Sequence, residues 1–328
     1  MTTMSTDTAT RVIEHLDARC PTTYVWRYET ELADLRALYE KAKGEQWDGR
    51  VDLAWDTDID PEKEYFPDEL IPIYGSAIWS KLDARNIREL RRHVVSWMLS
   101  QFMHGEQGAL LATAQIVTSA PSIDAKLFAA TQVMDEARHV EVYERYLREK
   151  VELTYPINAH LRTLLDQILA DSRWDMKYLG MQILVEGLAL AAFQIMHASS
   201  SEPLIKELTH GVMRDEARHV AFGVMSLREV YANDLSDRER RDREEFTVEA
   251  CRLMRDRFVH QEVWERLGMP VEECNRHAFD APQMREFRRL LFMRIVPNIK
   301  RLNLLTPFVR ERFAQLGILE FEDFPADA

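Results

Sequence analysis

The sequence predicts an all-α protein whose core is a four-helix bundle, with additional helices before and after it. Only 11 glycines and 12 prolines are spread over 328 residues, too few for a sandwich or barrel built on many tight turns. From about Asp83 onward, long segments carry apolar residues three and four positions apart, the spacing of a helix that packs on one face. One unit of glutamates and a histidine occurs twice within these segments. Together these observations favour helices gathered around a shared polar centre.

The N-terminal segment, 1–83, is less regular than the rest of the chain. Helical patterns occupy residues 11–20 and 29–43, and we expect a helix at each. Residues 47–74 contain three prolines among aspartates, which favours extended chain over helix. We expect this stretch to wrap over the core, anchored by five aromatic side chains: Trp47, Trp55, Tyr65, Phe66 and Tyr74.

Beyond this stretch the periodic segments follow one another with few helix breakers. The expected helices are 84–118, 122–150, 158–171, 174–199, 202–232, 237–267, 282–301 and 306–316. Ser236 followed by Glu239 is the pattern of a capping box, which supports a helix start at 237. The tail from about residue 319 is expected to be loose. We therefore expect a wrap at 1–83, a bundle at 84–232 and C-terminal helices packed on the bundle at 233–328.

One block of sequence occurs twice. The block DEARHV stands at residues 135–140 and again at 215–220. In each copy a further glutamate precedes the glutamate of the block, at the same separation and within an apolar segment. These pairs are Glu106 with Glu136 and Glu186 with Glu216.

The spacing within each unit is that of a metal-binding helical hairpin. Residues i and i+3 of a helix share a face, so each Glu-x-x-His presents a carboxylate and an imidazole together. The stretch from the single glutamate to this pair lets one helix end and the next return antiparallel, opposite that glutamate. Two such hairpins gather four carboxylates and two imidazoles at the centre of a four-helix bundle, as in carboxylate di-metal proteins. The predicted ligands are Glu106, Glu136, His139, Glu186, Glu216 and His219.

A network of structural salt bridges is the alternative explanation of the repeat. Buried carboxylates without a counter-charge cost on the order of several kcal/mol each, which favours a pair of divalent metals instead. A third Glu-x-x-His pair, Glu207 with His210, lacks both the block and an earlier partner glutamate. We interpret it as a chance copy at the surface.

Each block also carries an aspartate and an arginine beside the predicted ligands. A metal-bound histidine commonly donates its other ring N–H to a carboxylate. We therefore expect Asp215 to contact His139 and Asp135 to contact His219, across the two hairpins. Ordinary charge pairs between these aspartates and the arginines are the alternative. The four flanking residues are Asp135, Arg138, Asp215 and Arg218.

With these residues the sequence resembles the ferritin-like di-iron oxygenase and oxidase superfamily over residues 84–232. This superfamily includes bacterial multicomponent monooxygenase hydroxylases, acyl-carrier-protein desaturases, arylamine N-oxygenases and ribonucleotide reductase small subunits. The doubled block most resembles the monooxygenase hydroxylases. The resemblance implies a ferritin-like bundle holding two iron ions, with an Fe/Fe or an Mn/Fe pair left open. The first three predicted ligands would bind one ion and the last three the other, with some glutamates bridging.

Single positions depart from each subfamily. Leu190 stands where the monooxygenase hydroxylases carry a threonine, and Val212 where the arylamine N-oxygenases carry a third histidine. The gap between His139 and Glu186 is far shorter than in the reductase subunits. Tyr143, one turn after the first histidine, does match the radical tyrosine of those subunits. The resemblance therefore implies the metal centre and leaves the reaction open.

Small and apolar residues near the predicted ligands indicate a substrate pocket beside the metals. Close helix packing is the alternative reason for the small residues. The predicted pocket residues are Ala109, Leu110, Ala189, Leu190, Phe193, Val212, Phe222 and Gly223. Tyr143 is a candidate catalytic residue, with a structural core tyrosine and a redox-active radical as the alternatives.

These observations predict an O2-activating non-haem di-iron oxidoreductase of monooxygenase, N-oxygenase or desaturase type. Its substrate would be a small, largely apolar or aromatic molecule. Each turnover consumes two electrons, so a ferredoxin or flavoprotein reductase is expected as donor, and the resemblance implies a homodimer. The alternatives are a ferritin-like iron-storage or ferroxidase protein and a radical-generating subunit that uses Tyr143. The long segments outside the bundle, 1–83 and 233–328, argue against a storage cage.

The charge, the apolar segments and the cysteines indicate which partners and which cellular compartment to expect. The net charge of −13 and the lack of a basic stretch argue against nucleic-acid binding. The most apolar window, residues 181–196, is interrupted by Glu186 and is expected to be too short to cross a membrane. No signal peptide is visible, and three widely spaced cysteines fit a reducing compartment. We therefore expect a cytoplasmic protein.

Overall fold

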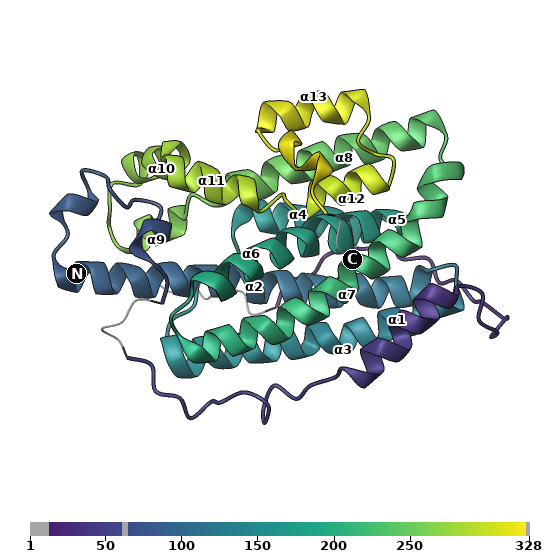
Figure 1. The fold of residues 1–328 in the computed structure, drawn as a ribbon, viewed down its shortest axis with the longest axis horizontal. Coiled ribbons are helices and arrows are strands. Elements are labelled where there is room, and N and C mark those ends of the chain that lie inside the picture. Colours follow the sequence, from purple (N-terminus) through teal and green to yellow (C-terminus); the bar gives the residue numbers. More distant parts are fainter. Residues whose placement is uncertain (1–12, 61–64, 326–328) are drawn as a thin grey trace, which may run out of the picture.

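The computed structural model describes residues 13–60 and 65–325 (Figure 1). Every regular element within these residues is a helix, and none of them forms a strand. The predicted all-α class is confirmed.

The first half of the core is a hairpin of two long helices. Helix α2 (Ala84–Ser119) begins at Asp83, whose carboxylate accepts the backbone N–H of Asn86. A short turn joins α2 to helix α3 (Ile123–Tyr146), which returns along it (Figure 1). A π-helical segment (Leu147–Val151) extends α3.

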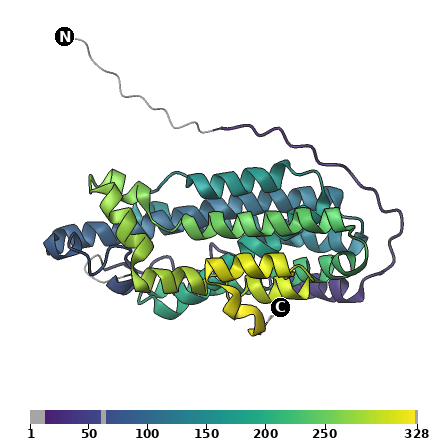
Figure 2. The same cartoon turned by 90° about the horizontal axis from the view of Figure 1, so that it is seen from above.

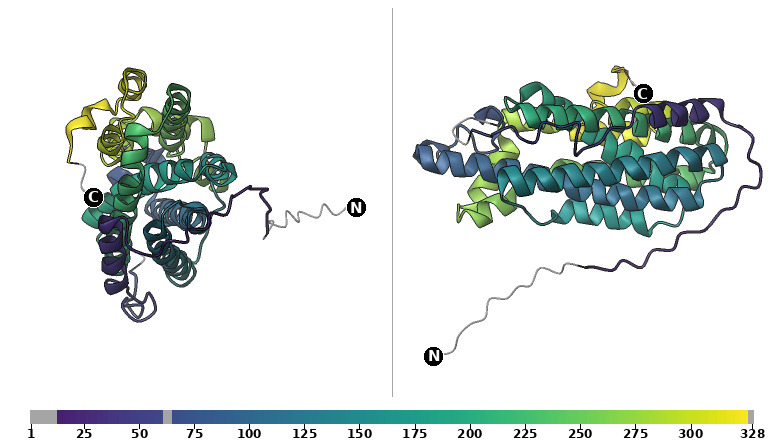
Figure 3. Two further views of the ribbon diagram at one scale, coloured as in Figure 1. Left: turned by 90° about the vertical axis from the view of Figure 1, so that its right-hand side faces the viewer. Right: turned by 90° about the horizontal axis from the view of Figure 1, so that it is seen from below.

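The second half of the core is a hairpin of similar shape. Helix α5 (Trp174–Tyr178), a π-helical segment (Leu179–Val185) and helix α6 (Glu186–Ser199) form one continuous rod. Helix α7 (Pro203–Asn233) returns along α6 and also packs on α3, which closes the four-helix core (Figure 3).

The rod Trp174–Ser199 corrects one expectation. It is 26 residues long, and the mean hydropathy of its most apolar 18-residue window is 1.6, so it is long and apolar enough to cross a membrane. However, 78% of its most apolar window is buried within this protein. Its apolar character is thus accounted for by its place at the centre of the core.

The N-terminal residues lie against the outside of the bundle. Helix α1 (Ala33–Gly44) packs on α3 and α7. The predicted helix at 11–20 is wrong for residues 13–20, which are extended (Figure 2); residues 11 and 12 lie outside the described residues. Asp124 accepts the backbone N–H groups of Glu31 and Leu32, at 2.9 and 2.8 Å. These bonds fix the chain just before α1, and the helix predicted from 29 begins at 33.

The described residues of the wrap between α1 and α2, 45–60 and 65–83, are irregular, as the prolines predict. They contain two single 3₁₀ turns, at Asp68–Leu70 and Trp79–Lys81. Trp55 is buried, and Trp47, Tyr65, Phe66 and Tyr74 are half-buried against the core.

The C-terminal helices cover the face of the bundle that carries helix α4 (Ala159–Ala170). They are α8 (Asp237–Asp256), α9 (Gln261–Arg266), α10 (Val271–Asp280), α11 (Pro282–Leu290), α12 (Ile295–Arg301) and α13 (Pro307–Leu316) (Figure 1). The predicted capping box is present, because Ser236 and Glu239 bond each other's backbone N–H groups. The Arg243 guanidinium donates two hydrogen bonds to Asp175, at 3.0 and 3.1 Å, and ties α8 to α5.

Three boundaries in this region differ from the predictions. The helix expected over 237–267 ends at Asp256 and resumes at Gln261, because Phe258 and His260 turn inward to pack on Trp97. The helix expected over 282–301 divides into α11 and α12, and α10 was not predicted. Propensity alone does not reveal such breaks, since tertiary contacts make them.

The tail is also more ordered than predicted. Residues Leu319–Asp323 form a 3₁₀ turn in which Phe321 is buried. Acidic side chains of this turn pair with Arg289, Lys300 and Arg310 of the neighbouring helices. The expectation of a loose tail is wrong for these residues.

Two glycines of the core provide a matched test of its packing. A Cβ atom at Gly223 would lie 2.7 Å from the Cβ of Gln182, whereas a Cβ at Gly105 would meet nothing within 4 Å. We expect Gly223→Ala to lower the free energy of unfolding by about 1–3 kcal/mol through overpacking. Gly105→Ala should leave it unchanged or raise it by up to about 1 kcal/mol, the gain in helix propensity. Equal urea-denaturation midpoints for the two variants would contradict the packing described for α7.

Candidate metal centre

The six predicted ligands lie together in the middle of the four-helix core, and all are buried. One group of facing ligand atoms comprises Glu106, Glu136, His139 and Glu216, and a second comprises Glu136, Glu186 and His219. Within each group these atoms lie within 4.8 Å of one another. Glu136 belongs to both groups, which is the arrangement of a bridging carboxylate.

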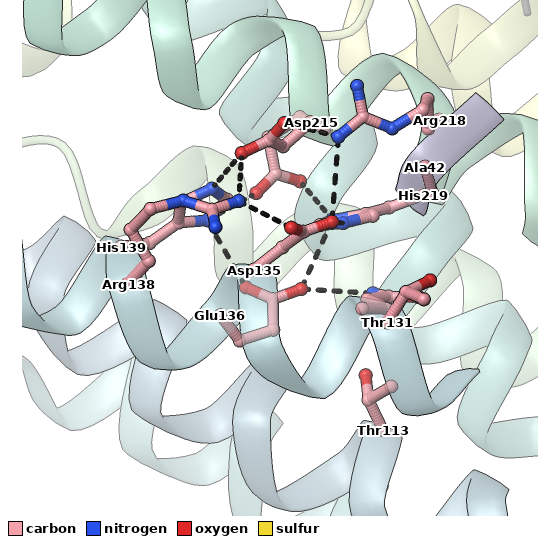
Figure 4. Close-up of polar contacts among 12 residues, drawn as sticks. Ala42, Thr113, Thr131, Asp135, Glu136, Arg138, His139, Asp215, Arg218 and His219 are labelled. Carbon is pink, nitrogen blue, oxygen red and sulfur yellow. Dashed lines mark hydrogen bonds and ion pairs between the residues drawn. The ribbon is translucent and has the colours of Figure 1, made fainter. Parts of the chain in front are cut away.

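Each imidazole points one nitrogen at the carboxylates. The His139 Nδ1 atom lies 3.2 Å from Glu106, and 3.4 Å from both Glu136 and Glu216. The His219 Nδ1 atom lies 3.2 Å from Glu136 and 3.6 Å from Glu216. Figure 4 shows the two imidazoles on opposite sides of the α3 and α7 aspartates. The centre is therefore nearly symmetric between the two hairpins.

Several polar atoms in this centre have no hydrogen-bond partner. They are one carboxylate oxygen each of Glu136 and Glu186, both oxygens of Glu216, and the Nδ1 atom of His219. Buried polar atoms are normally satisfied, and each exception requires an explanation. Carboxylate oxygens and imidazole nitrogens are ligands for iron and manganese, so the unsatisfied donor set fits a pair of such ions.

The electrostatics of the centre lead to the same inference. Burial raises the pKa of Glu106 and of Glu186 well above the usual range, and the adjacent Glu216 raises both further. Burial also acts on Glu136, but His219 and His139 hold its pKa below the usual range. The carboxylates raise the pKa of both histidines despite burial. Without metal ions, the buried carboxylates would have to hold protons to reduce their negative charge. Bound metal cations would replace these protons.

The other nitrogen of each imidazole faces an aspartate of the opposite hairpin. His139 Nε2 lies 3.1 Å from Asp215, and His219 Nε2 lies 3.3 Å from Asp135. Arg138 donates to both aspartates, at 2.9 Å to Asp215 (Figure 4). The alternatives drawn from the sequence thus coexist, since each aspartate contacts a histidine and an arginine together.

The end of α1 and the residues after it complete this network, which the sequence did not predict. The Trp47 indole donates to Asp215 at 2.7 Å, and the Gln46 amide donates to Asp135 at 2.9 Å. Arg218 donates to Glu45 at 2.9 Å. These contacts are long-range, so no local pattern marks them.

Gln132 was also missed. Its amide donates to Glu136 at 3.0 Å and to Glu186 at 2.9 Å, and so joins the two hairpins inside the centre. Gln132 holds the position in the first repeat that Val212 holds in the second. A comparison of the two repeats would therefore have placed it one turn before a predicted ligand.

Tyr143 lies in the core beside the centre. Its side chain is fully buried, its hydroxyl has no hydrogen-bond partner, and its ring packs on Phe102 and Phe193. Burial raises its pKa well above the usual range, and the charge of Glu106 raises it further. The phenol is thus held neutral near the predicted ligands.

A cavity of about 20 Å³ adjoins the centre, with room for about one water molecule. Its walls include three predicted ligands and two of the eight predicted pocket residues, Ala109 and Ala189. The other lining residues are Gln101, Phe102, Gly105, Leu161, Val185 and Arg257.

The remaining predicted pocket residues do not line this cavity. Phe222 packs on Phe128 and Tyr178, and Gly223 lies against Gln182, so close packing explains both. The four others that lie outside it are Leu110, Leu190, Phe193 and Val212. Superposing the repeats identifies residues near the metals but not the side of the helix that faces open space.

Replacing one of the two arginines that pair with both aspartates tests the network. Arg138→Leu removes one of the two buried arginines that pair with Asp135 and Asp215, which should lower the free energy of unfolding by about 3–5 kcal/mol. Arg148→Leu removes an exposed arginine paired with Glu144, so its effect should be about 0–1 kcal/mol. Chemical denaturation of both variants measures the difference, and a loss at Arg138 no larger than at Arg148 would contradict the network.

The alignment with one solved structure supports the fold. An R2-like ligand-binding oxidase with an aerobically reconstituted metal cofactor after photoconversion aligns with a TM-score of 0.53 and 16% identity, covering 81% of this chain and 92% of that chain. A mutant R2-like ligand-binding oxidase with an aerobically reconstituted Mn/Fe cofactor aligns with a TM-score of 0.48 and 18% identity, covering 82% and 92%. A search of curated protein sequences gives no match.

Comparison with protein-family models identifies the family. Residues 29–303 match the model described as P-aminobenzoate N-oxygenase AurF, and this span includes every residue of the centre. Most of the chain is therefore covered by one model. The chain belongs to the P-aminobenzoate N-oxygenase AurF family and is a non-haem di-iron enzyme of the oxygenase and oxidase type.

Proposed function

We propose that this protein is an O2-dependent N-oxygenase that acts on a small aromatic amine. The observation that carries the proposal is the pair of buried Glu/His groups, in which several facing carboxylate oxygens and one imidazole nitrogen have no hydrogen-bond partner. The family match supports N-oxygenation over hydroxylation and desaturation. Because Val212 stands in place of the third histidine of arylamine N-oxygenases, the predicted ligand set has six members.

In this proposal Glu106, Glu136 and His139 bind one metal ion, and Glu186, Glu216 and His219 bind the other. The placement of Glu136 in both groups, and of Glu216 within reach of both histidines, supports bridging roles for these two. Two iron ions are the proposed occupants, with Mn/Fe as the second choice. When bound, they supply the electron transfer to O2 that oxygen insertion requires.

The protein surroundings would control the conditions of this chemistry. Asp215 and Asp135 orient the two imidazoles, and Arg138 and Arg218 fix the aspartates. Apolar side chains such as Phe102, which line the cavity, exclude bulk water from the reaction. Tyr143 is proposed to keep a neutral hydroxyl near the centre as a proton donor.

The overall reaction would convert an aromatic amine, O2, two electrons and two protons into an aryl hydroxylamine and water. An external reductant has to provide the two electrons, so we propose a ferredoxin or flavoprotein as partner. The acidic chain, with a net charge of −13, favours a basic docking surface on that donor. A homodimer is the proposed assembly.

Metal analysis tests the ligand assignment. Glu186→Ala and His139→Ala each remove a proposed ligand and should lower bound iron well below two ions per chain. His210→Ala is the matched control, because His210 belongs to the third Glu-x-x-His pair and is exposed. Full iron content in both ligand variants would show that the assignment is wrong.

Product analysis tests the reaction. The iron-loaded protein, supplied with p-aminobenzoate, a chemical reductant and isotopically labelled O2, should yield a product with labelled oxygen on nitrogen, and Glu186→Ala should not. Mass spectrometry distinguishes this from ring hydroxylation by the fragment that carries the label. An unlabelled amine together with many iron atoms per chain after desalting would instead favour the storage alternative.

A further inference from the structure

A buried arginine forms part of the wall of the cavity beside the metal centre. Arg257 is the residue that ends α8, and its side chain is 6% exposed. It lines the cavity together with Glu106, Glu186 and Glu216, which come from α2, α6 and α7. Arg257 therefore contributes to the wall of the same small space as three of the proposed metal ligands.

The guanidinium of Arg257 forms no ion pair with any of residues 13–60 and 65–325. Its Nε atom has no hydrogen-bond partner, and the group packs instead on the ring of Phe258, whose centroid lies 4.7 Å from the guanidinium carbon. Burial lowers the pKa of Arg257 to about 10, which leaves it charged at neutral pH. A buried charge without a partner is costly, so its presence requires an explanation.

The other buried arginines have hydrogen-bond or ion-pair partners for their guanidinium groups. Arg138 and Arg218 pair with the aspartates of the centre, and Arg243 pairs with Asp175. Arg288 donates to the backbone carbonyl of Ala278, at 2.7 Å, at the end of α10. Within the described residues, Arg257 differs from all four in lacking a protein acceptor, and it is the buried arginine that lines the cavity beside the proposed ligands.

We propose that Arg257 binds a carboxylate of the organic substrate and thereby determines which substrates are oriented towards the metals. The planar guanidinium matches a carboxylate through two parallel hydrogen bonds. The apolar walls, such as Phe102 and Leu161, would contact the body of the molecule. This inference rests on the proposed function and adds a specificity-determining residue to it.

The cavity is too small, as it stands, to hold an aromatic acid. At about 20 Å³ it holds about one water molecule, so an aromatic acid has to displace part of the wall. Gly105 provides room for this displacement, because it lines the cavity and a Cβ atom there would meet nothing within 4 Å.

The competing explanation is that Arg257 only balances the charge of the buried glutamates. In that case its removal would alter metal binding and would leave the preference among organic ligands unchanged. The charge-balancing explanation therefore predicts a change in metal binding, and the proposal predicts a change in the preference among organic ligands.

Calorimetric titration of the iron-loaded protein with benzoate and with benzamide separates them, since the two molecules have nearly the same shape and differ in charge. We expect wild type to bind benzoate more tightly than benzamide. Arg257→Met should weaken benzoate binding about tenfold to hundredfold, the value of charge-assisted hydrogen bonds, with benzamide unaffected. Arg257→Lys keeps the charge and loses the planar guanidinium. Its affinity for benzoate should lie between those of wild type and Arg257→Met.

Arg255→Met is the matched control, because it removes the same charge two residues away from a side chain paired with Asp256. It should bind benzoate as wild type does. Equal affinity of wild type for benzoate and benzamide, no binding of benzoate, or unchanged benzoate binding in Arg257→Met would each overturn the proposal. Should Arg257→Met not fold, wild type and Arg257→Lys still decide the question.

Iron content, measured on the same samples, separates this test from that of the proposed function. Two ions per chain in wild type with no preference for benzoate would reject the role of Arg257 alone. Wild type that binds no iron would reject the proposed function itself. Loss of iron in Arg257→Met, with the benzoate preference retained, would establish the charge-balancing role instead.

Discussion

The structure depends on one costly arrangement, the burial of four carboxylates at the centre of a helical bundle. Such groups are stable there only with compensating positive charge. Two imidazoles, two arginines and the proposed metal ions provide it, and each imidazole is oriented by an aspartate from the opposite hairpin. The hairpins are thus joined through their polar residues as well as through apolar packing.

The two sides of this centre differ. On the side of α1, Gln46 and Trp47 close the centre with hydrogen bonds to the aspartates. On the side of α2 and α6, a small cavity with both apolar and charged walls adjoins the proposed ligands, and the C-terminal part of the chain adds Arg257 to it. The repeat generates a symmetric metal site, and the segments outside the repeat make it asymmetric. A substrate would therefore approach from the α2 and α6 side.

The sequence predicts contacts that follow from helical spacing within the repeat, and it does not predict contacts that residues outside the repeat make far along the chain. The gathering of the six Glu and His side chains could be predicted because helix geometry fixes which residues share a face over three or four positions, as with Glu136 and His139. The roles of Gln46 and Trp47 could not, since their hydrogen-bond partners stand far along the chain, in α3 and α7. Arg257 was missed for a similar reason: the sequence predicts one helix over 237–267, and only the inward turn of Phe258 and His260 ends that helix just before Arg257.

Anomalous X-ray diffraction from crystals of the iron-loaded protein, recorded on both sides of the iron absorption edge, tests the central claim most directly. The account predicts two iron peaks inside the bundle, one among Glu106, Glu136 and His139 and the other among Glu186, Glu216 and His219, with at least one glutamate contacting both. A single peak, peaks outside the bundle, or an ordered centre without metal in the presence of excess iron would contradict it.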